Sequence, residues 1–128
     1  MLPTQANSLV LFGGYVLELE DGNYYCGISQ HVCKRIGDHI LNKGSRWTKL
    51  HKPVRVVETC IIMDADPKVW EKRRTLELMR EYGWRRVRGG PFTRVQMNHA
   101  PACLKLNPDR PLDTFSTDVN EAGELKYE

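Results

Sequence analysis

The turn signal Glu20-Asp21-Gly22-Asn23 constrains the fold more than any other stretch of this sequence. Residues 9–20 and 24–28, on either side of it, are rich in apolar, β-branched and aromatic side chains. Asp-Gly between two such runs is a strong signal for two antiparallel strands joined by a tight turn. The sequence therefore predicts a β-hairpin, interrupted in its first strand by Gly13-Gly14.

Two hairpin loops are compatible with this turn. A two-residue loop would place Tyr15 opposite Ile28, and Tyr15 and Tyr25 would then point to opposite faces because side chains alternate along a strand. A three-residue loop with Gly22 in the left-handed conformation would place Tyr15 opposite Gly27, and both tyrosines would share one face. Turn chemistry alone does not choose between the two.

Further elements follow the hairpin along the chain. Ser29 is a plausible N-cap for a helix that ends near Lys43 at Gly44, and a basic loop then leads to a β-branched strand over residues 54–62. Asp66 and Pro67 predict the start of a second helix that reaches about Tyr82. The order β-β-α-β-α indicates a small α/β or α+β unit on a short mixed or antiparallel sheet.

Length and charge suggest one domain with a polyanionic partner. A chain of 128 residues has room for one modest core, which we place in residues 9–101 between an N-terminal extension (1–8) and an acidic, partly flexible tail (102–128). Residues 104–128 carry three basic and six acidic side chains, a net charge of −3, so the first 103 residues hold +6. A basic body of this kind favours a polyanionic partner.

The expected compartment and the exclusion of a zinc site both follow from features that the sequence lacks. It has no apolar run of the roughly 18–20 residues that a membrane span requires, and its first residues lack the basic region of a signal peptide. We therefore expect an intracellular, cytoplasmic protein without a membrane partner. The spacings of its four cysteines match no zinc-ligand pattern.

The first predicted helix carries two stripes of side chains. Positions four apart give a polar stripe beside an apolar one: His31, Arg35, His39 and Lys43, and Val32, Ile36 and Ile40. The polar stripe can be read as a solvated basic face. It can also be read as a guanidinium and an imidazole lying side by side above the hairpin, near two phenols. The second interpretation supplies a functional reason for the three-residue loop.

At this point the sequence resembles the GIY-YIG nuclease domain. "GGY" (13–15) stands in the place of the GIY motif and "YCG" (25–27) in the place of YIG, nine residues apart, with Gly14 and Cys26 replacing the two isoleucines at packing positions. Arg35 and His39 follow at the spacing of the family's helical arginine and histidine. "NKGSRWTKLHKPV" is similar to the family's basic loop "GKGAxxTxxxxPV". The resemblance covers about residues 13–90 and implies a short, three-stranded, mostly antiparallel sheet flanked by helices.

The family also uses a glutamate on a later helix to hold a divalent metal ion, and two candidates exist. Glu71 shares an apolar helical stripe with Leu78, Met79 and others, which points it inward. Glu77 shares a face with charged side chains, which is typical of a solvent-facing position. We therefore assign the metal to Glu71, whose other interpretation is an ordinary acid favoured near a helix N-terminus.

The resemblance implies a metal-dependent DNA endonuclease that leaves 5′-phosphate and 3′-hydroxyl ends. Glu71 would hold Mg²⁺ or Mn²⁺, and Arg35 would contact the scissile phosphate. Tyr15 would align or deprotonate the attacking water, while Tyr25 and His39 would bind the phosphate and support proton transfer. The catalytic set is thus Tyr15, Tyr25, Arg35, His39 and Glu71.

Two clusters of basic and aromatic residues are candidates for nucleic-acid binding, because such side chains suit phosphate contact and base stacking. They comprise Lys43, Arg46, Trp47, Lys49, His51 and Lys52 in the first cluster, and Arg85, Arg86 and Arg88, next to Trp84, in the second. Each cluster could instead be a solubilising surface, and the tryptophans could be core residues.

Other functions fit parts of the sequence. The scaffold could be a catalytically inactive nucleic-acid-binding module, or a partner-binding factor acting through its acidic tail. The nucleic acid could be branched or nicked DNA, or RNA, and a homodimer or a protein partner could supply specificity. Repair, phage or mobile-element and restriction roles all remain open.

Overall fold

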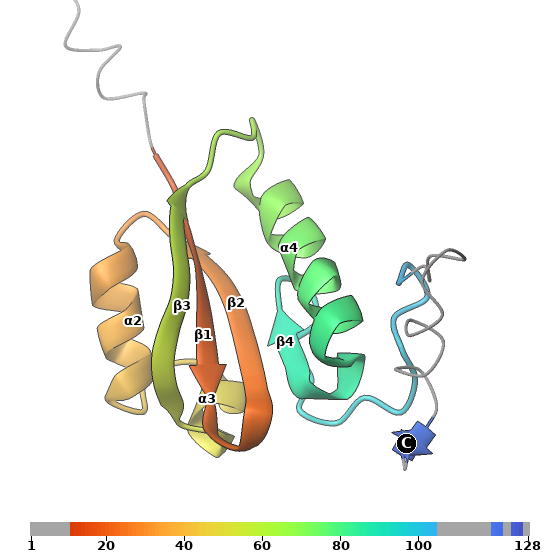
Figure 1. Ribbon diagram of the computed structural model, residues 1–128. Coiled ribbons are helices and arrows are strands. Elements are labelled where there is room, and N and C mark those ends of the chain that lie inside the picture. Colours follow the sequence, from red (N-terminus) through yellow and green to blue (C-terminus); the bar gives the residue numbers. More distant parts are fainter. Residues whose placement is uncertain (1–10, 105–118, 122–123, 127–128) are drawn as a thin grey trace, which may run out of the picture.

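The computed structural model describes residues 11–104, 119–121 and 124–126. The expected N-terminal extension (1–8) and most of the acidic tail therefore lie outside the described residues. Figure 1 shows the arrangement of the elements. In chain order they are β1 (Gly13–Leu19), η1 (Glu20–Gly22), β2 (Asn23–Ser29), α2 (Val32–Ile40), α3 (Arg46–Leu50), β3 (Pro53–Ile61), α4 (Pro67–Tyr82), η2 (Trp84–Arg86), β4 (Val87–Gly89), β5 (Val119–Glu121) and β6 (Glu124–Lys126).

The main sheet has four strands in the order β3-β1-β2-β4. This confirms the predicted α+β fold but corrects the expected three strands. β1 pairs antiparallel with β2 and β3, whereas β4 pairs parallel with β2. β4 has only three residues and lies in the segment that we had read as a basic connector, so it carries too little periodicity to be recognised from sequence.

The β1–β2 hairpin has the register of the three-residue loop. Tyr15 lies opposite Gly27 and Leu17 opposite Tyr25, so the two tyrosines share one face as required. Asp21 and Gly22 have φ values of 60° and 76°, in the left-handed region. The left-handed conformation at position 22 favours glycine, which explains why Gly22 follows Asp21.

Each face of the sheet has its own core, and Figure 1 shows the sheet lying between α2 on one side and α4 on the other. Tyr15, Leu17, Leu19, Tyr25 and Trp47 form the cluster on the α2 side, with Val32 and Ile36 packed against it. The α4 side buries the residues that alternate with them, together with residues of the helix: Val16, Cys26, Trp70, Leu78, Met79 and Trp84. Alternation along β1 and β2 thus decides what each face holds.

Helix α4 begins and ends where the sequence predicts. The carboxylate of Asp66 accepts a hydrogen bond from the Lys68 backbone N–H, Pro67 occupies the first turn, and Gly83 (φ 100°) follows the last residue. Helix α2 is shorter than expected, since it starts at Val32 rather than after Ser29 and ends at Ile40. The expected basic loop contains a further short helix, α3, which Ser45 caps.

Strand β3 lies at an edge of the sheet. Its pairing with β1 shifts register twice, skipping Val57 and Val54. Its outward side chains include the exposed Val54, Val56 and Ile61. Across the described ranges, no helix has the length and apolar character needed to cross a membrane.

Candidate active site

Three rings from three elements meet on the α2 side of the sheet. Tyr15 (β1) and Tyr25 (β2) lie with ring centroids 6.3 Å apart, and the imidazole of His39 (α2) lies 5.6 Å from the first and 5.0 Å from the second. The Tyr15 hydroxyl and His39 Nε2 form a 2.8 Å hydrogen bond. Tyr15 and His39 are each only 1% exposed, so both partners of this bond are buried side chains.

Two glycines make the room for this contact. A Cβ atom at Gly27 would overlap the ring and hydroxyl of Tyr15, and one at Gly44 would overlap the imidazole of His39. Gly27 therefore lets the phenol lie flat against the neighbouring strand, which is the local reason for a glycine at the end of "YCG".

Helix α3 supplies a second partner for the imidazole. His39 Nδ1 lies 2.9 Å from Oγ1 of Thr48, which is fully buried. Burial, and after it the charge of Arg35, lowers the pKa of His39 to about 4 against an opposing effect of Asp38. His39 is therefore neutral at pH 7.

Arg35 lies one helical turn before His39 and is half-buried. Its positive charge lowers the pKa of both tyrosines, against the larger effect of burial. Its contact with Asp38 is long, at 4.0 Å, so the guanidinium keeps donors for another anion. Burial nevertheless raises the pKa of both Tyr15 and Tyr25 above 10, because it disfavours the phenolate.

Glu71 lies on α4, the helix on the other side of the sheet from α2. Its charge raises the pKa of both Tyr15 and Tyr25. Burial raises the pKa of Glu71 itself, while a hydrogen bond from the Gly90 backbone N–H and the charge of Lys68 oppose that rise. A pocket of about 430 Å³ opens beside it, lined by Lys68, Glu71, Lys72, Gly90 and Pro91. Glu77 is instead exposed and pairs with Arg74 at 3.1 Å.

The donors at this point suit a hard divalent cation. Within the described parts of the chain, no three His, Cys, Asp or Glu side chains gather as a ligand cluster. Mg²⁺ is commonly held by one or two carboxylates and keeps several waters. A single, partly desolvated Glu71 carboxylate therefore fits Mg²⁺ or Mn²⁺ and does not fit a cage formed by protein ligands alone.

The polar stripe expected on the first helix does not exist as a surface stripe. His39 points into the protein beneath α3, whereas Ile40, expected to pack, is 63% exposed. Val32 and Ile36 do pack on the sheet. Residues 32, 36 and 39 lie on the inner face of the helix. Ile40, the last residue of α2, lies outside this face and is directed away from the sheet.

The proposed nucleic-acid-binding residues divide into exposed and buried sets. Six of them carry exposed basic side chains: Lys43, Arg46, Lys49, Lys52, Arg85 and Arg86. Arg86 donates to the Asp21 carbonyl at 2.8 Å, and Arg85 lies over the Trp84 ring. His51 is half-buried, and its ring packs edge-on against Trp47.

Arg88 and Trp47 are corrections, because neither is open to a ligand. Arg88 is 2% exposed and donates to the backbone carbonyls of Trp84, Arg85, Val87, Arg94 and Val95. Its guanidinium lies 4.4 Å from the ring centroid of Trp47, which is itself 5% exposed. Burial lowers the pKa of Arg88 to about 10. Arg88 thus holds the chain together rather than binding a substrate.

Sequence reasoning missed several residues that shape the site. Thr48 and Ser45 were taken as part of a loop, although serine is a favoured residue at a helix N-cap. Lys68 and Lys72 were not singled out, although both lie within one helical turn of Glu71 on the predicted helix. Trp70 was also missed; its indole lies where a Cβ at Gly14 would be.

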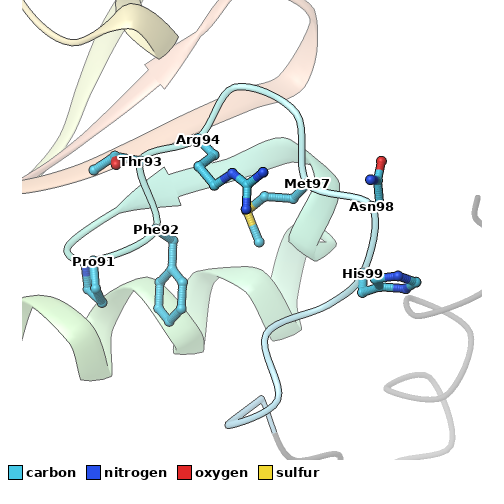
Figure 2. A pocket seen from close by; sticks show the side chains of 7 residues that line it. All are labelled: Pro91, Phe92, Thr93, Arg94, Met97, Asn98 and His99. Carbon is cyan, nitrogen blue, oxygen red and sulfur yellow. The ribbon is translucent and has the colours of Figure 1, made fainter.

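A second hollow, of about 240 Å³, lies in segment 91–99 and does not contain the predicted catalytic residues. Figure 2 shows the Phe92 ring pointing toward α4, while Asn98 and His99 point away from it. Arg88 anchors this segment through the carbonyls of Arg94 and Val95.

A family model and several curated proteins match parts of this sequence. The family model of the GIY-YIG catalytic domain matches residues 12–84, more than half of the chain. A UPF0213 protein of Bacillus cereus is 45% identical over 40 residues, which cover 31% of this chain and 42% of that protein. A UPF0213 protein of Halalkalibacterium halodurans is 30% identical over 80 residues, which cover 61% of this chain and 85% of that protein.

A UPF0213 protein of Fusobacterium nucleatum subsp. nucleatum is 40% identical over 42 residues, which cover 33% of this chain and 42% of that protein. The match therefore spans less than half the length of the Bacillus and Fusobacterium relatives. No solved structure matches the chain.

Proposed function

The chain belongs to the GIY-YIG family of nuclease-type domains, and from that premise we propose that it is a metal-dependent DNA endonuclease. It hydrolyses phosphodiester bonds and leaves 5′-phosphate and 3′-hydroxyl ends. The observation that carries the proposal is the buried hydrogen bond between Tyr15 and His39, with Arg35 and Tyr25 beside it and the charge of Glu71 acting on both tyrosines.

Arg35 and Tyr25 bind the scissile phosphate. The guanidinium offers a planar donor fork to two phosphoryl oxygens, and its contact to Asp38 is weak enough to yield to them. The Tyr25 hydroxyl donates a further hydrogen bond. Together they counter the negative charge that builds on the phosphoryl oxygens in the transition state.

Glu71 is the residue that would hold the divalent metal ion, which when bound supplies Lewis-acid stabilisation of the phosphoryl and leaving oxygens. Lys68 and Lys72, which line the pocket beside Glu71, favour an anion there as well. The raised pKa of Glu71 reflects partial desolvation of its carboxylate. A bound cation would stabilise the charged carboxylate and offset this effect.

Tyr15 and His39 handle the proton of the attacking water. The water oxygen forms a bond to phosphorus while the bond from phosphorus to the 3′-oxygen breaks. The water gives one proton to the Tyr15 oxygen as the phenolic proton passes to His39 Nε2. The 3′-oxygen leaves with the bonding electron pair and takes a proton from solvent water to become a hydroxyl. Because the pKa of Tyr15 is raised, the phenol cannot release its proton to water alone and needs the imidazole.

The exposed cations around α3 bind the flanking DNA. Lys43, Arg46, Lys49 and Lys52 are all exposed, and Thr48 in the same helix contacts His39. This basic surface, defined by those four residues, therefore adjoins the site. Contacts to the DNA phosphates position the protein on the duplex but do not read its base sequence. Selectivity therefore comes from DNA shape or from a second subunit or partner.

The proposal is tested by plasmid nicking with purified protein in Mg²⁺, Mn²⁺ and EDTA. We expect metal-dependent nicking, a roughly hundredfold rate loss in Arg35→Ala, equivalent to about 3 kcal/mol, and a comparable or larger loss in Glu71→Gln. Product ends are identified by ligation and by labelling after phosphatase treatment.

Matched control variants separate the effect of losing a charged side chain from the effect of losing a catalytic one. Arg73→Ala and Glu77→Gln remove an arginine and a glutamate of α4 that form surface ion pairs with Asp64 and Arg74, and should cleave at the wild-type rate. DNA binding without any cleavage by the wild type would replace the proposal with an inactive binding module. Removing residues 105–128 should leave cleavage intact if the acidic tail serves only a partner.

A further inference from the structure

A chain of buried hydrogen bonds leads from the first tyrosine into α3. Tyr15 bonds to His39 Nε2 at 2.8 Å, and His39 Nδ1 bonds to Thr48 Oγ1 at 2.9 Å. Thr48 Oγ1 in turn lies 3.1 Å from the carbonyl oxygen of Ser45. Neither Thr48 nor Ser45 is among the catalytic residues assigned above, yet both stand behind the imidazole.

The direction of this chain can be worked out from which groups are able to accept. Tyr15 is almost fully buried, so its O–H needs an acceptor inside the protein. The Arg35 guanidinium, whose charge acts on this hydroxyl, can only donate. The acceptor is therefore His39 Nε2, which must carry a lone pair rather than a proton.

The rest of the chain follows from this step. A neutral imidazole with a free Nε2 carries its proton on Nδ1, and that N–H donates to Thr48 Oγ1. The Thr48 hydroxyl then accepts from His39 and donates its own proton to the Ser45 carbonyl. Each donor in this series of hydrogen bonds then has one acceptor. If the series ran the other way, with the proton on His39 Nε2, the Tyr15 hydroxyl proton would have no acceptor.

We propose that Thr48 is a positioning residue that fixes His39 in the Nδ1–H tautomer, so that Nε2 is available to accept the proton of Tyr15. The use of that tautomer in cleavage rests on the proposed function, whereas the tautomer itself does not. Thr48 acts through His39 and contacts neither substrate nor metal ion.

Local structure holds Thr48 in the orientation that this requires. The Ser45 side chain caps α3 by accepting from the Thr48 backbone N–H, so the helix start fixes the threonine relative to the Ser45 carbonyl. Gly44, just before the cap, is the residue whose missing Cβ lets the imidazole approach. One turn of helix thus both closes the loop and orients the histidine.

The groups that face His39 from its neighbours leave this arrangement unchanged at neutral pH. They are Tyr15 and Tyr25 from the sheet, Arg35 and Asp38 from its own helix, and Thr48 from α3. Both tyrosines are protonated there, and the charge of Arg35 disfavours the imidazolium. The histidine therefore has one proton, whose position the hydrogen bonds determine.

The tautomer is measured directly by two-dimensional ¹⁵N–¹H NMR of the imidazoles at pH 7, with His39→Gln used to assign the His39 signals. In the wild type, Nδ1 should give the protonated resonance and Nε2 the unprotonated one. The reverse pattern overturns the proposal without any substitution being made.

Thr48→Val and Thr48→Ser then test the role of the hydroxyl. The valine keeps the shape and removes the acceptor, so the His39 signals should move toward a mixture with the Nε2–H tautomer, while the serine should keep the wild-type pattern. An unchanged Nδ1–H tautomer in Thr48→Val overturns the proposal. If the valine variant does not fold, Thr48→Ala provides the same comparison.

Kinetics separate this role from a purely structural one. In Thr48→Val, kcat should fall by roughly tenfold to a hundredfold, by analogy with the loss of a partner that orients a metal-bound imidazole, with KM little changed. Thr48→Ser should restore kcat. A rise in KM alone, or a loss in both variants alike, overturns the positioning role. If the wild type shows no cleavage, the proposed function fails while the NMR result still decides the tautomer.

Discussion

His39 is neutral in the folded protein at pH 7, and this makes stability depend on pH. Its folded pKa is about 4, below the ordinary value of 6.5, mainly because of burial. Between these two values the unfolded chain takes up a proton that the folded chain does not. The stabilising contribution is thus complete above pH 6.5 and is lost as pH falls toward 4, by about 3 kcal/mol in all.

Urea unfolding of the wild type at pH 7 and pH 4.5, compared with His39→Gln, measures this contribution. Glutamine cannot take up a proton in this range, so the variant should lose less stability on acidification, with a difference of about 2–3 kcal/mol from the wild type. Identical losses in both proteins would mean that another group carries the pH dependence.

The family resemblance proposed which residues form the site, but the contacts between them could not be predicted from the sequence. Tyr15, Tyr25, Arg35 and His39 repeat the motif intervals of the family, and the hairpin register follows once both phenols are required on one face. Thr48 was invisible in that role because its contact with His39 depends on how α3 folds back over α2. Burial of His39 was likewise missed, since a helical stripe fixes neighbours but not its angle to the sheet.

At the scale of elements, Arg88 ties together the region from η2 to segment 91–99. It makes five hydrogen bonds to backbone carbonyls and stacks on Trp47 of α3. Arg88→Met keeps most of the side-chain volume but leaves these buried carbonyls without a donor. The free energy of unfolding should fall by roughly 3 kcal/mol or more, measured by chemical denaturation.

Arg73→Met is the matched control for this measurement. Arg73 has a half-exposed side chain and forms one surface ion pair with Asp64 at 3.3 Å, so its loss should cost less than about 1 kcal/mol. Equal effects of the two substitutions would show that the buried carbonyl contacts of Arg88 contribute little.

Element boundaries were predicted well where capping chemistry is explicit and poorly elsewhere. Asp66, Pro67 and Gly83 mark α4 without ambiguity. α3 and β4 are too short to show a period, and their existence depends on tertiary partners such as the Arg88–Trp47 stack. The pairing of Gly14 with Trp70 shows the same limit, because sequence indicates a packing position but not the side chain that fills it.

At the scale of the whole molecule, the exposed cations near α3 should determine how strongly DNA binding depends on salt. Arg46→Ala and Lys49→Ala each remove one phosphate contact in the proposal. Each should therefore reduce the slope of log K against log salt by about 1, measured by fluorescence anisotropy without divalent metal.

Arg73→Ala removes the same charge on α4, where the side chain is held by Asp64, and its slope should match the wild type. A uniform reduction in all three variants would mean that binding responds to net charge alone and that no particular face of the molecule is used.

Strand β3 combines an edge that favours aggregation with irregularities that oppose it. A nine-residue rim strand with exposed valine and isoleucine side chains is the kind of template on which chains add to one another and form fibrous aggregates. The two register shifts at Val57 and Val54 bend that rim, so its outward amides and carbonyls do not present the regular spacing that an added strand requires. Straightening β3 by deleting either residue would give a more regular sheet and a protein more prone to aggregate.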